Sequence, residues 1–265
     1  MLFYNLHMLS ITSSLLNSIP YTKHNFFSRS VVSQNESYSL NCNMSSEDKK
    51  FYMKSIANFF DLNVDDLKLL KQIHSNKVIV INKREQACDA IEADGLVTNL
   101  SGILLCIRTA DCVPILFCDQ DNAIIGAAHA GWKGAFGGVI QNVVAEMKNL
   151  GAKRIKAAIG PCIRSQNYEV DKNFHLLALK NNPESEVFFF ENSQYDNYKF
   201  DLAGYCLMLL KTLNVIVDDL KIDTYSNTQL FFSYRKACHD ANAKGDKDQV
   251  VYGNQISAIM IDAYM

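Results

Sequence analysis

Two histidines and one cysteine have the residue types and the surroundings of a metal site. Cys112 stands in Thr109-Ala110-Asp111-Cys112, and His129 follows it at short range, with His74 further upstream. Two imidazoles and a thiolate can hold zinc and leave a fourth position for water, as catalytic zinc sites do. Cys112 and His129 can equally form a nucleophile and its base. The residue types alone leave both chemistries open.

The stretch after His129 is rich in glycine, at positions Gly131, Gly134, Gly137 and Gly138. Glycine lets a backbone approach a ligand closely. We expect a helix to begin near Gly134, where free N–H groups favour an anion, and Lys133 adds a positive charge. This turn is therefore a candidate phosphate site, and an ordinary strand-to-helix turn is the plainer alternative.

Two carboxylates are candidates for moving protons. Asp94 stands in Ala-Asp-Gly and Glu169 in Tyr-Glu-Val. Either side chain can act as a general acid or base if it faces the metal. The plainer interpretation is that Asp94 makes a turn and Glu169 pairs with a basic side chain.

The composition excludes several classes of protein. With 48% hydrophobic and 20% charged residues, the chain has an ordinary globular composition, and its net charge of -2 predicts no nucleic-acid partner. The leucine-rich start lacks the basic residues of a signal peptide, and charges interrupt the later apolar runs, so we expect no membrane segment. The eight cysteines form no disulfide framework, which favours reduced thiols and a cytoplasmic protein.

The elements that must position these residues follow from hydrophobic spacing. Apolar residues three and four apart predict one helix from about Gly134 to Leu150 and a second from Leu202 to Leu213, with Asp201 as its cap. Short β-branched runs predict strands at Val78–Ile81, Ile103–Ile107, Val113–Phe117, Ala123–Ala128, Ile155–Ile159, Val187–Phe190 and Ile222–Thr224. The polar stretch Lys236–Gln249 reads as an exposed loop before a last strand, Val250–Ile261. Strands outnumber helices, so the expected class is α+β.

Motifs along the whole chain resemble the laccase-domain family, also called the multicopper polyphenol oxidoreductase or YfiH-type family. They are Phe27-Ser28-Arg29, Ser39-Leu40-Asn41, Gln72-Ile73-His74, Ala93-Asp94-Gly95, Thr109-Ala110-Asp111-Cys112, Ala128-His129-Ala130-Gly131-Trp132-Lys133-Gly134, Ile159-Gly160-Pro161-Cys162, Tyr168-Glu169-Val170, Phe200-Asp201-Leu202 and Phe232-Ser233-Tyr234-Arg235. The resemblance implies one domain of mixed β-sheets flanked by helices in a layered sandwich, over residues 26–265 after an extension of residues 1–25.

The resemblance also implies a function and a set of site residues. Family members resemble purine nucleoside phosphorylases with added adenosine deaminase activity, so adenosine, inosine, S-methyl-5'-thioadenosine and phosphate are the expected substrates of a monomer or homodimer. The implied zinc ligands are His74, Cys112 and His129, and the implied catalytic residues are Cys112, Asp94 and Glu169. The implied substrate-binding residues are Arg29, Asn41, Lys133 and Arg235.

Zinc lowers the pKa of water, which is how zinc deaminases attack an electron-poor ring carbon. Copper also suits a thiolate and imidazole set, so Cu²⁺ and a weak polyphenol oxidation are a second expectation. A true multicopper oxidase needs more imidazoles than the six that this chain has. At most one such metal is expected.

The chain departs from the family pattern at four places. Val31-Val32 stands where a glycine pair is usual, Asp223-Thr224-Tyr225 stands in a segment where a cysteine is usual, Gly253-Asn254 stands where Gly-Arg is usual, and residues 237–248 look inserted. Two alternatives stay open. One is a metal-free hydrolase or deamidase with Cys112 as nucleophile, and the other is a degenerate binding protein without catalysis.

Overall fold

Two large β-sheets form the body of the protein. The computed structural model describes residues 10–33, 36–41, 45–192, 197–245 and 250–262. The first sheet has the order β1-β2-β16-β4-β3, and β8 joins it by pairing with both β16 and β5. Its strands are β1 (Ser10–Ile11), β2 (Thr22–Phe27), β3 (Ser30–Ser33), β4 (Glu36–Asn41), β5 (Leu67–Lys68), β8 (Leu104–Thr109) and β16 (Gly253–Ile261).

The second sheet has the order β15-β11-β9-β10-β7-β6. Its strands are β6 (Val78–Ile81), β7 (Gly95–Thr98), β9 (Val113–Asp119), β10 (Ile125–Ala130), β11 (Ile155–Ile159) and β15 (Ile216–Asp219). The inner pairs are antiparallel, whereas the outer pairs β6/β7 and β11/β15 are parallel. A small third sheet contains β12 (Glu169–Val170), β14 (Asn197–Phe200) and β13 (Phe189–Asn192) in that order.

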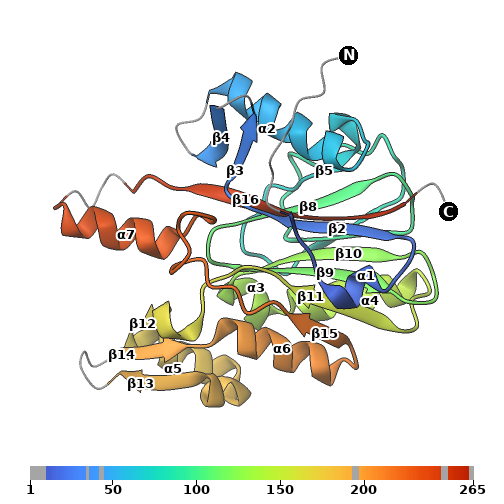
Figure 1. The fold of residues 1–265 in the computed structure, drawn as a ribbon. Coiled ribbons are helices and arrows are strands. Elements are labelled where there is room, and N and C mark those ends of the chain that lie inside the picture. The colour runs from blue at the N-terminus through green and yellow to red at the C-terminus, as the bar shows by residue number, and fades with distance from the viewer. Residues whose placement is uncertain (1–9, 34–35, 42–44, 193–196, 246–249, 263–265) are drawn as a thin grey trace.

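The two large sheets pack face to face, and helices cover their outer faces (Figure 1). In β9, Ile115 and Phe117 point to the helix side, while Leu116 and Cys118 point into the core between the sheets. This alternation is what a strand buried on both faces requires. The result is a sandwich of four layers, with helix, sheet, sheet and helix in that order.

The helices are α1 (Ser14–Asn17), α2 (Ser46–Phe59), α3 (Trp132–Gly137), α4 (Val139–Asn149), α5 (Lys172–Asn181), α6 (Leu202–Thr212) and α7 (Tyr234–Ala243). Residues of α2 pack on the first sheet, and residues of α4 and α6 pack on the second. The helix predicted from Gly134 is present, but Gly138, with φ of 95°, divides it into α3 and α4. The second predicted helix is α6, where the Asp201 side chain accepts a hydrogen bond from Gly204 N at 2.9 Å.

The sequence predictions need three corrections. The predicted loop Lys236–Gln249 is wrong over its first part, which is helix α7. The strand predicted at Ile222–Thr224 is wrong. The strand of this region that pairs with β11 is β15, which ends before it, at Asp219. Much of the run Val187–Phe190 is also not strand, since a 3₁₀ helix extends to Phe188 and β13 begins at Phe189.

The expected α+β class, with mixed sheets flanked by helices, is confirmed by this architecture. The boundary predicted between residues 25 and 26 falls inside β2, and Leu16 and Ile19 are buried between the two large sheets. The described part of the first 25 residues therefore belongs to the body of the sandwich.

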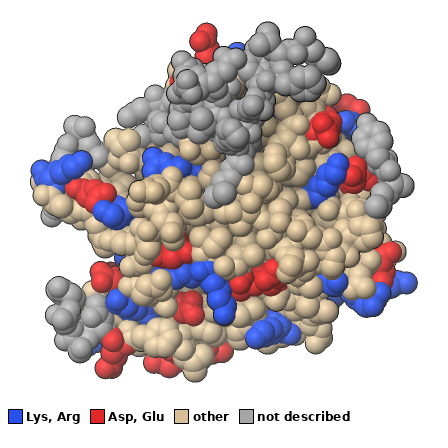
Figure 2. Space-filling view, viewed as in Figure 1, with Lys and Arg blue, Asp and Glu red and all other residues tan. Residues whose placement is uncertain are grey.

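No helix of the described chain is long and apolar enough to cross a bilayer. On the face seen in Figure 2, acidic and basic side chains are interspersed, and the described atoms of that face form no extended basic patch.

Candidate metal centre

His74, Cys112 and His129 come together where the chain passes between the two large sheets. Cys112 lies in the turn that leaves β8 of the first sheet and enters β9 of the second. The loop with His74 also crosses over, from β5 to β6. His129 is near the end of β10, on the strand face that points between the sheets.

The geometry of the three side chains fits a single metal ion. One potential ligand atom from each residue lies within 4.8 Å of the other two. The Cys112 Sγ is 3.7 Å from the His74 Nε2, and the two imidazole rings meet edge to face with centroids 4.8 Å apart. Two imidazoles and one thiolate are a donor set that zinc and copper both accept.

Asp94 fixes two of these three residues from behind. Its fully buried carboxylate accepts a hydrogen bond from His129 Nδ1 at 2.7 Å and another from the backbone N of His74 at 3.0 Å. The other oxygen accepts from Ser75 N at 2.6 Å and from Ser75 Oγ at 2.7 Å. Because Nδ1 of His129 is engaged, Nε2 remains the metal-binding atom, an arrangement that metal-binding histidines commonly have.

The ionisation of Asp94 agrees with this role. Burial acts to raise the pKa of its carboxyl group, but the hydrogen bonds from His129 and Ser75 outweigh burial and lower the pKa to about 2. The carboxylate is therefore charged at neutral pH, and donors occupy both of its oxygens. This environment suits a positioning residue better than a group that exchanges protons with a substrate.

Cys112 and His129 influence each other strongly. Burial acts to raise the pKa of the Cys112 thiol, but the charge of His129 and hydrogen bonds from both histidines lower it to about 6. Burial acts to lower the pKa of His129, but the charge of Cys112 and the bond to Asp94 raise it to about 9. Cys112 is thus a thiolate at neutral pH, the form that a metal or an electrophile needs.

The glycines after His129 have a packing explanation. A Cβ atom on Gly131 would lie 2.7 Å from Cδ2 of His74 and 3.1 Å from Sγ of Cys112. A Cβ atom on Gly134 would lie 2.9 Å from the carbonyl oxygen of Ser75. These glycines therefore let helix α3 approach the candidate ligands closely, and they explain the turn without a bound phosphate.

Asp111 joins the cysteine turn to helix α7. Its backbone has φ of 86°, a conformation that non-glycine residues seldom adopt. Its carboxylate accepts hydrogen bonds from Thr224 Oγ1 at 2.6 Å, Ser233 Oγ at 3.0 Å and Arg235 N at 2.7 Å. These bonds hold the start of α7 next to Cys112.

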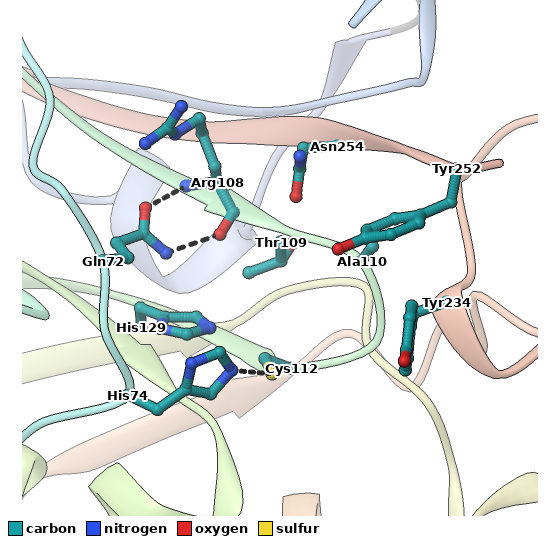
Figure 3. Close-up of a pocket in the computed structure, with 10 residues that line it drawn as sticks. All are labelled: Gln72, His74, Arg108, Thr109, Ala110, Cys112, His129, Tyr234, Tyr252 and Asn254. Atoms are coloured by element: carbon teal, nitrogen blue, oxygen red, sulfur yellow. Dashed lines mark hydrogen bonds between the residues drawn. The ribbon is translucent and has the colours of Figure 1, made fainter. Parts of the chain in front are cut away.

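Two cavities flank the cysteine. The larger one, of about 520 Å³, contains the three candidate ligands together with Gln72, Arg108, Thr109, Tyr234, Tyr252 and Asn254 (Figure 3). The smaller one, of about 260 Å³, has a mainly apolar wall that includes Trp132, Ile163, Tyr168 and Leu202, with Arg235 among them. Both cavities share His74, Cys112 and Tyr234, so a molecule that spans them passes directly over the candidate metal ligands.

The family model of the multi-copper polyphenol oxidoreductase laccases matches residues 23–262. The chain belongs to this family. The resemblance predicted from the motifs is confirmed. The three candidate ligands described above account for one metal ion, and the chain has only six histidines.

Relatives within the laccase family carry the names of enzymes. Purine nucleoside phosphorylase RC0672 of Rickettsia conorii is 36% identical over 187 residues, which cover 70% of this chain and 76% of the relative. Purine nucleoside phosphorylase RP494 of Rickettsia prowazekii is 35% identical over 79% of this chain and 83% of the relative. Adenosine deaminase RL5, from an unknown prokaryotic organism, is 41% identical over 44% of this chain and 48% of the relative. The chain therefore belongs to a family of enzymes.

Solved structures of similar fold support the architecture. Protein NMB0706 of Neisseria meningitidis superposes with a TM-score of 0.75 at 26% identity, covering 97% of this chain and 99% of that one. The YfiH protein of Bacillus licheniformis superposes with a TM-score of 0.78 at 24% identity, covering 96% of each chain. This chain thus shares its layered sandwich with both solved structures.

Among the predicted substrate-binding residues whose side chains the structure describes, Arg235 lines a cavity beside the metal ligands, whereas Arg29 and Lys133 line neither. The exposed Lys133 places its Nζ 5.4 Å from the ring centroid of Trp132. Arg29 donates to the carbonyl of Thr228 at 2.7 Å and lies over the Phe232 ring. The backbone of Asn41 pairs with Gly253, and its side chain lies outside the described residues.

Glu169 touches the site through its backbone. Its carbonyl oxygen accepts a hydrogen bond from Arg235 Nη1 at 2.5 Å, and the residue itself lines neither cavity. In the described part of the chain, Glu169 therefore holds Arg235 in place, and its carboxylate does not reach the candidate ligands.

Sequence reasoning missed several residues of the larger cavity. Both polar atoms of the Gln72 side-chain amide form hydrogen bonds: Oε1 accepts from Arg108 N at 2.9 Å, and Nε2 donates to Arg108 O at 2.7 Å. Thr109 and Asn254 are neutral and common residue types, so their type gave no sign of a site. Two signals were nevertheless available, because Thr109 stands three residues before Cys112 and Asn254 replaces the arginine of the family pattern.

Proposed function

We propose that this protein is a zinc-dependent purine nucleoside phosphorylase that acts on adenosine, inosine and S-methyl-5'-thioadenosine and also deaminates adenosine. The proposal rests on the position of His74, Cys112 and His129 at the junction of two cavities. The names of the relatives agree with both activities. Zinc supplies Lewis acidity when it is bound to these side chains.

In phosphorolysis, a phosphate oxygen forms a bond to C1′ of the ribose while the bond from C1′ to N9 breaks. The electron pair of that bond leaves with the purine, and the products are a free base and ribose 1-phosphate. Arg108 and Arg235 each line one cavity, and among the described residues neither has a carboxylate within ion-pair distance. Unneutralised guanidinium groups favour an anion such as phosphate or a departing purine.

We assign phosphate to the Arg108 end of the larger cavity and the purine to the Arg235 side of the smaller one. The two groups then lie on opposite sides of the ribose, as a displacement at C1′ requires. The Arg108 guanidinium is directed away from the three candidate ligands (Figure 3). Lys133 is left out of the phosphate site, because its amine lies over the ring of Trp132.

The test measures release of hypoxanthine from inosine by protein of known zinc content. We expect release only when phosphate is present, about one zinc per chain, and loss of both zinc and activity in Cys112→Ala. Inosine formed from adenosine without phosphate would report the deaminase activity. Cleavage of inosine at the same rate without phosphate would contradict the phosphorylase assignment. Copper loading that yields weak phenol oxidation is the expected side reaction of the same trio.

A second candidate function is a metal-free cysteine hydrolase, which the lowered pKa of Cys112 favours. In chelator-treated protein, alkylation of Cys112 should proceed at a lower pH than alkylation of an ordinary cysteine, because the pKa of its thiol is lowered and the thiolate is the reacting form. Mass spectrometry of the modified peptide measures the rate of this alkylation. Zinc should suppress alkylation if the trio binds metal, whereas a hydrolase would react equally with and without zinc.

A further inference from the structure

Two polar side chains in the larger cavity have no hydrogen-bond partner within the described structure. Thr109 is 1% exposed, and its Oγ1 is buried without a partner. The side-chain amide of Asn254, which lines the same cavity, makes no hydrogen bond to the described residues. A buried hydroxyl group without a partner is costly, so native proteins normally leave one only where something else satisfies it.

The two residues lie on neighbouring strands beside the candidate metal ligands. Thr109 is the last residue of β8 and pairs with Gln255 of β16, the residue after Asn254. The Thr109 side chain lies between the Asn254 amide and the side chains of His129 and Cys112 (Figure 3). A ligand held by Thr109 and Asn254 would therefore sit within the same cavity as the candidate metal ligands.

The chemistry of this pair selects a neutral group. A threonine hydroxyl and an asparagine amide each offer both a donor and an acceptor, and neither is charged. Hydroxyl groups of a ligand have the same double character. An anion would call for donors alone, and a planar base would call for flat apolar walls, which the smaller cavity provides through Trp132 and Tyr168.

We propose that Thr109 and Asn254 form the sugar subsite of this protein and bind the ribose hydroxyl groups of the nucleoside. This inference rests on the proposed function. With the sugar at these residues and the base in the smaller cavity, the bond between sugar and base lies at the wall that the cavities share, beside His74 and Cys112. Thr109 and Asn254 then determine specificity for the ribose over its deoxy forms.

The experiment compares inosine, 2′-deoxyinosine and 3′-deoxyinosine with wild-type protein, Thr109→Val and Asn254→Ala. The readouts are kcat/KM with phosphate and, without phosphate, the Kd from calorimetry. We expect each substitution to weaken inosine about three- to ten-fold, the usual range for one buried neutral hydrogen bond. For each variant, one deoxy analogue lacks the hydroxyl group that the substituted residue contacts. That analogue should bind the variant and the wild type equally well.

Thr212→Val, on the exposed end of α6, is the matched control and should leave all three nucleosides unaffected. Equal weakening of all three nucleosides by Thr109→Val and Asn254→Ala would overturn the sugar subsite, because a merely structural role acts without regard to the hydroxyl groups. Absence of turnover would contradict the proposed phosphorylase. The calorimetric comparison would then still decide whether the pair distinguishes ribose from its deoxy forms.

Discussion

At the scale of single residues, the candidate metal centre depends on Asp94 as much as on its ligands. One carboxylate orients the His129 ring and holds the backbone of His74, so it connects two ligands that are far apart in sequence. Partners of this kind commonly set metal affinity, because they fix which ring nitrogen is available. Asp94 was predicted as a proton-transfer group, but both of its oxygens are engaged by the residues that it positions.

Asp94→Asn should weaken zinc binding about 10- to 100-fold, because the amide removes the charge that holds the Nδ1 proton of His129. Competition with a chromophoric chelator measures the zinc affinity. Asp89 is an exposed residue a short distance upstream of Asp94 in the sequence. Asp89→Asn is therefore the control, and it should leave the zinc affinity unchanged. If Asp94→Asn bound zinc as tightly as the wild type, the orienting role of the carboxylate would be refuted.

At the scale of elements, the approach of helix α3 to the ligands is set by Gly131. Gly131→Ala should reduce the bound zinc, because its methyl group would occupy the space of His74 and Cys112. Gly137→Ala in the same helix is the control, since its Cβ atom would meet nothing closer than 3.6 Å. Zinc per chain and the thermal unfolding midpoint measure the two effects separately. Full zinc content in Gly131→Ala would contradict this account.

Helix α7 depends on a residue distant in sequence. Asp111→Ala should lower the free energy of unfolding by about 3 kcal/mol, because buried donors at Thr224, Ser233 and Arg235 lose their acceptor. Chemical denaturation measures this loss. Asp240→Ala, which removes an exposed carboxylate within α7, should change the free energy by less than about 0.5 kcal/mol. Equal losses in both variants would remove the special role of Asp111.

The contact between Asp111 and the start of α7 also explains why sequence alone predicts some helices and not others. Helix α6 has a long apolar stripe and its own cap, Asp201, so local sequence was sufficient. Helix α7 is polar, and Ala241 is the buried residue among those described in it. Its start is held by a hydrogen bond to Asp111, which lies far upstream in the sequence. No local pattern contains that information. The candidate ligands were predicted by their residue types and by the family resemblance. Thr109 and Asn254 were also named in the sequence, but only the fold places them in one cavity with the ligands.

At the scale of the whole molecule, the site exists because two sheets face each other and the chain crosses between them at one edge. His24 on β2 contributes to the stability of this packing. Its Nε2 accepts a hydrogen bond from Ser13 N at 2.8 Å, and Ser13 Oγ donates to Asp218 of β15 in the opposite sheet at 2.6 Å. Ser13, which caps the start of α1, thus bridges the two sheets.

Acid should weaken this bridge. Burial lowers the pKa of His24 from 6.5 to about 4, although the charge of Asp218 acts in the opposite direction. Between these pH values the unfolded chain binds the proton and the folded chain does not. The contribution of His24 to stability is therefore complete above about pH 6.5 and is lost as the pH falls towards 4. The shift corresponds to about 3 kcal/mol.

Denaturation curves for wild-type protein and His24→Gln between pH 7 and pH 4 test this expectation. The glutamine oxygen can still accept from Ser13 N, but it does not take up a proton in this range. We expect the stability of the wild type to fall more steeply with acid than that of His24→Gln, because only the wild type must hold a buried imidazole neutral. His239→Gln, at a half-buried position on α7, is the control and should retain the wild-type slope. Parallel curves for wild type and His24→Gln would show that other groups govern acid unfolding.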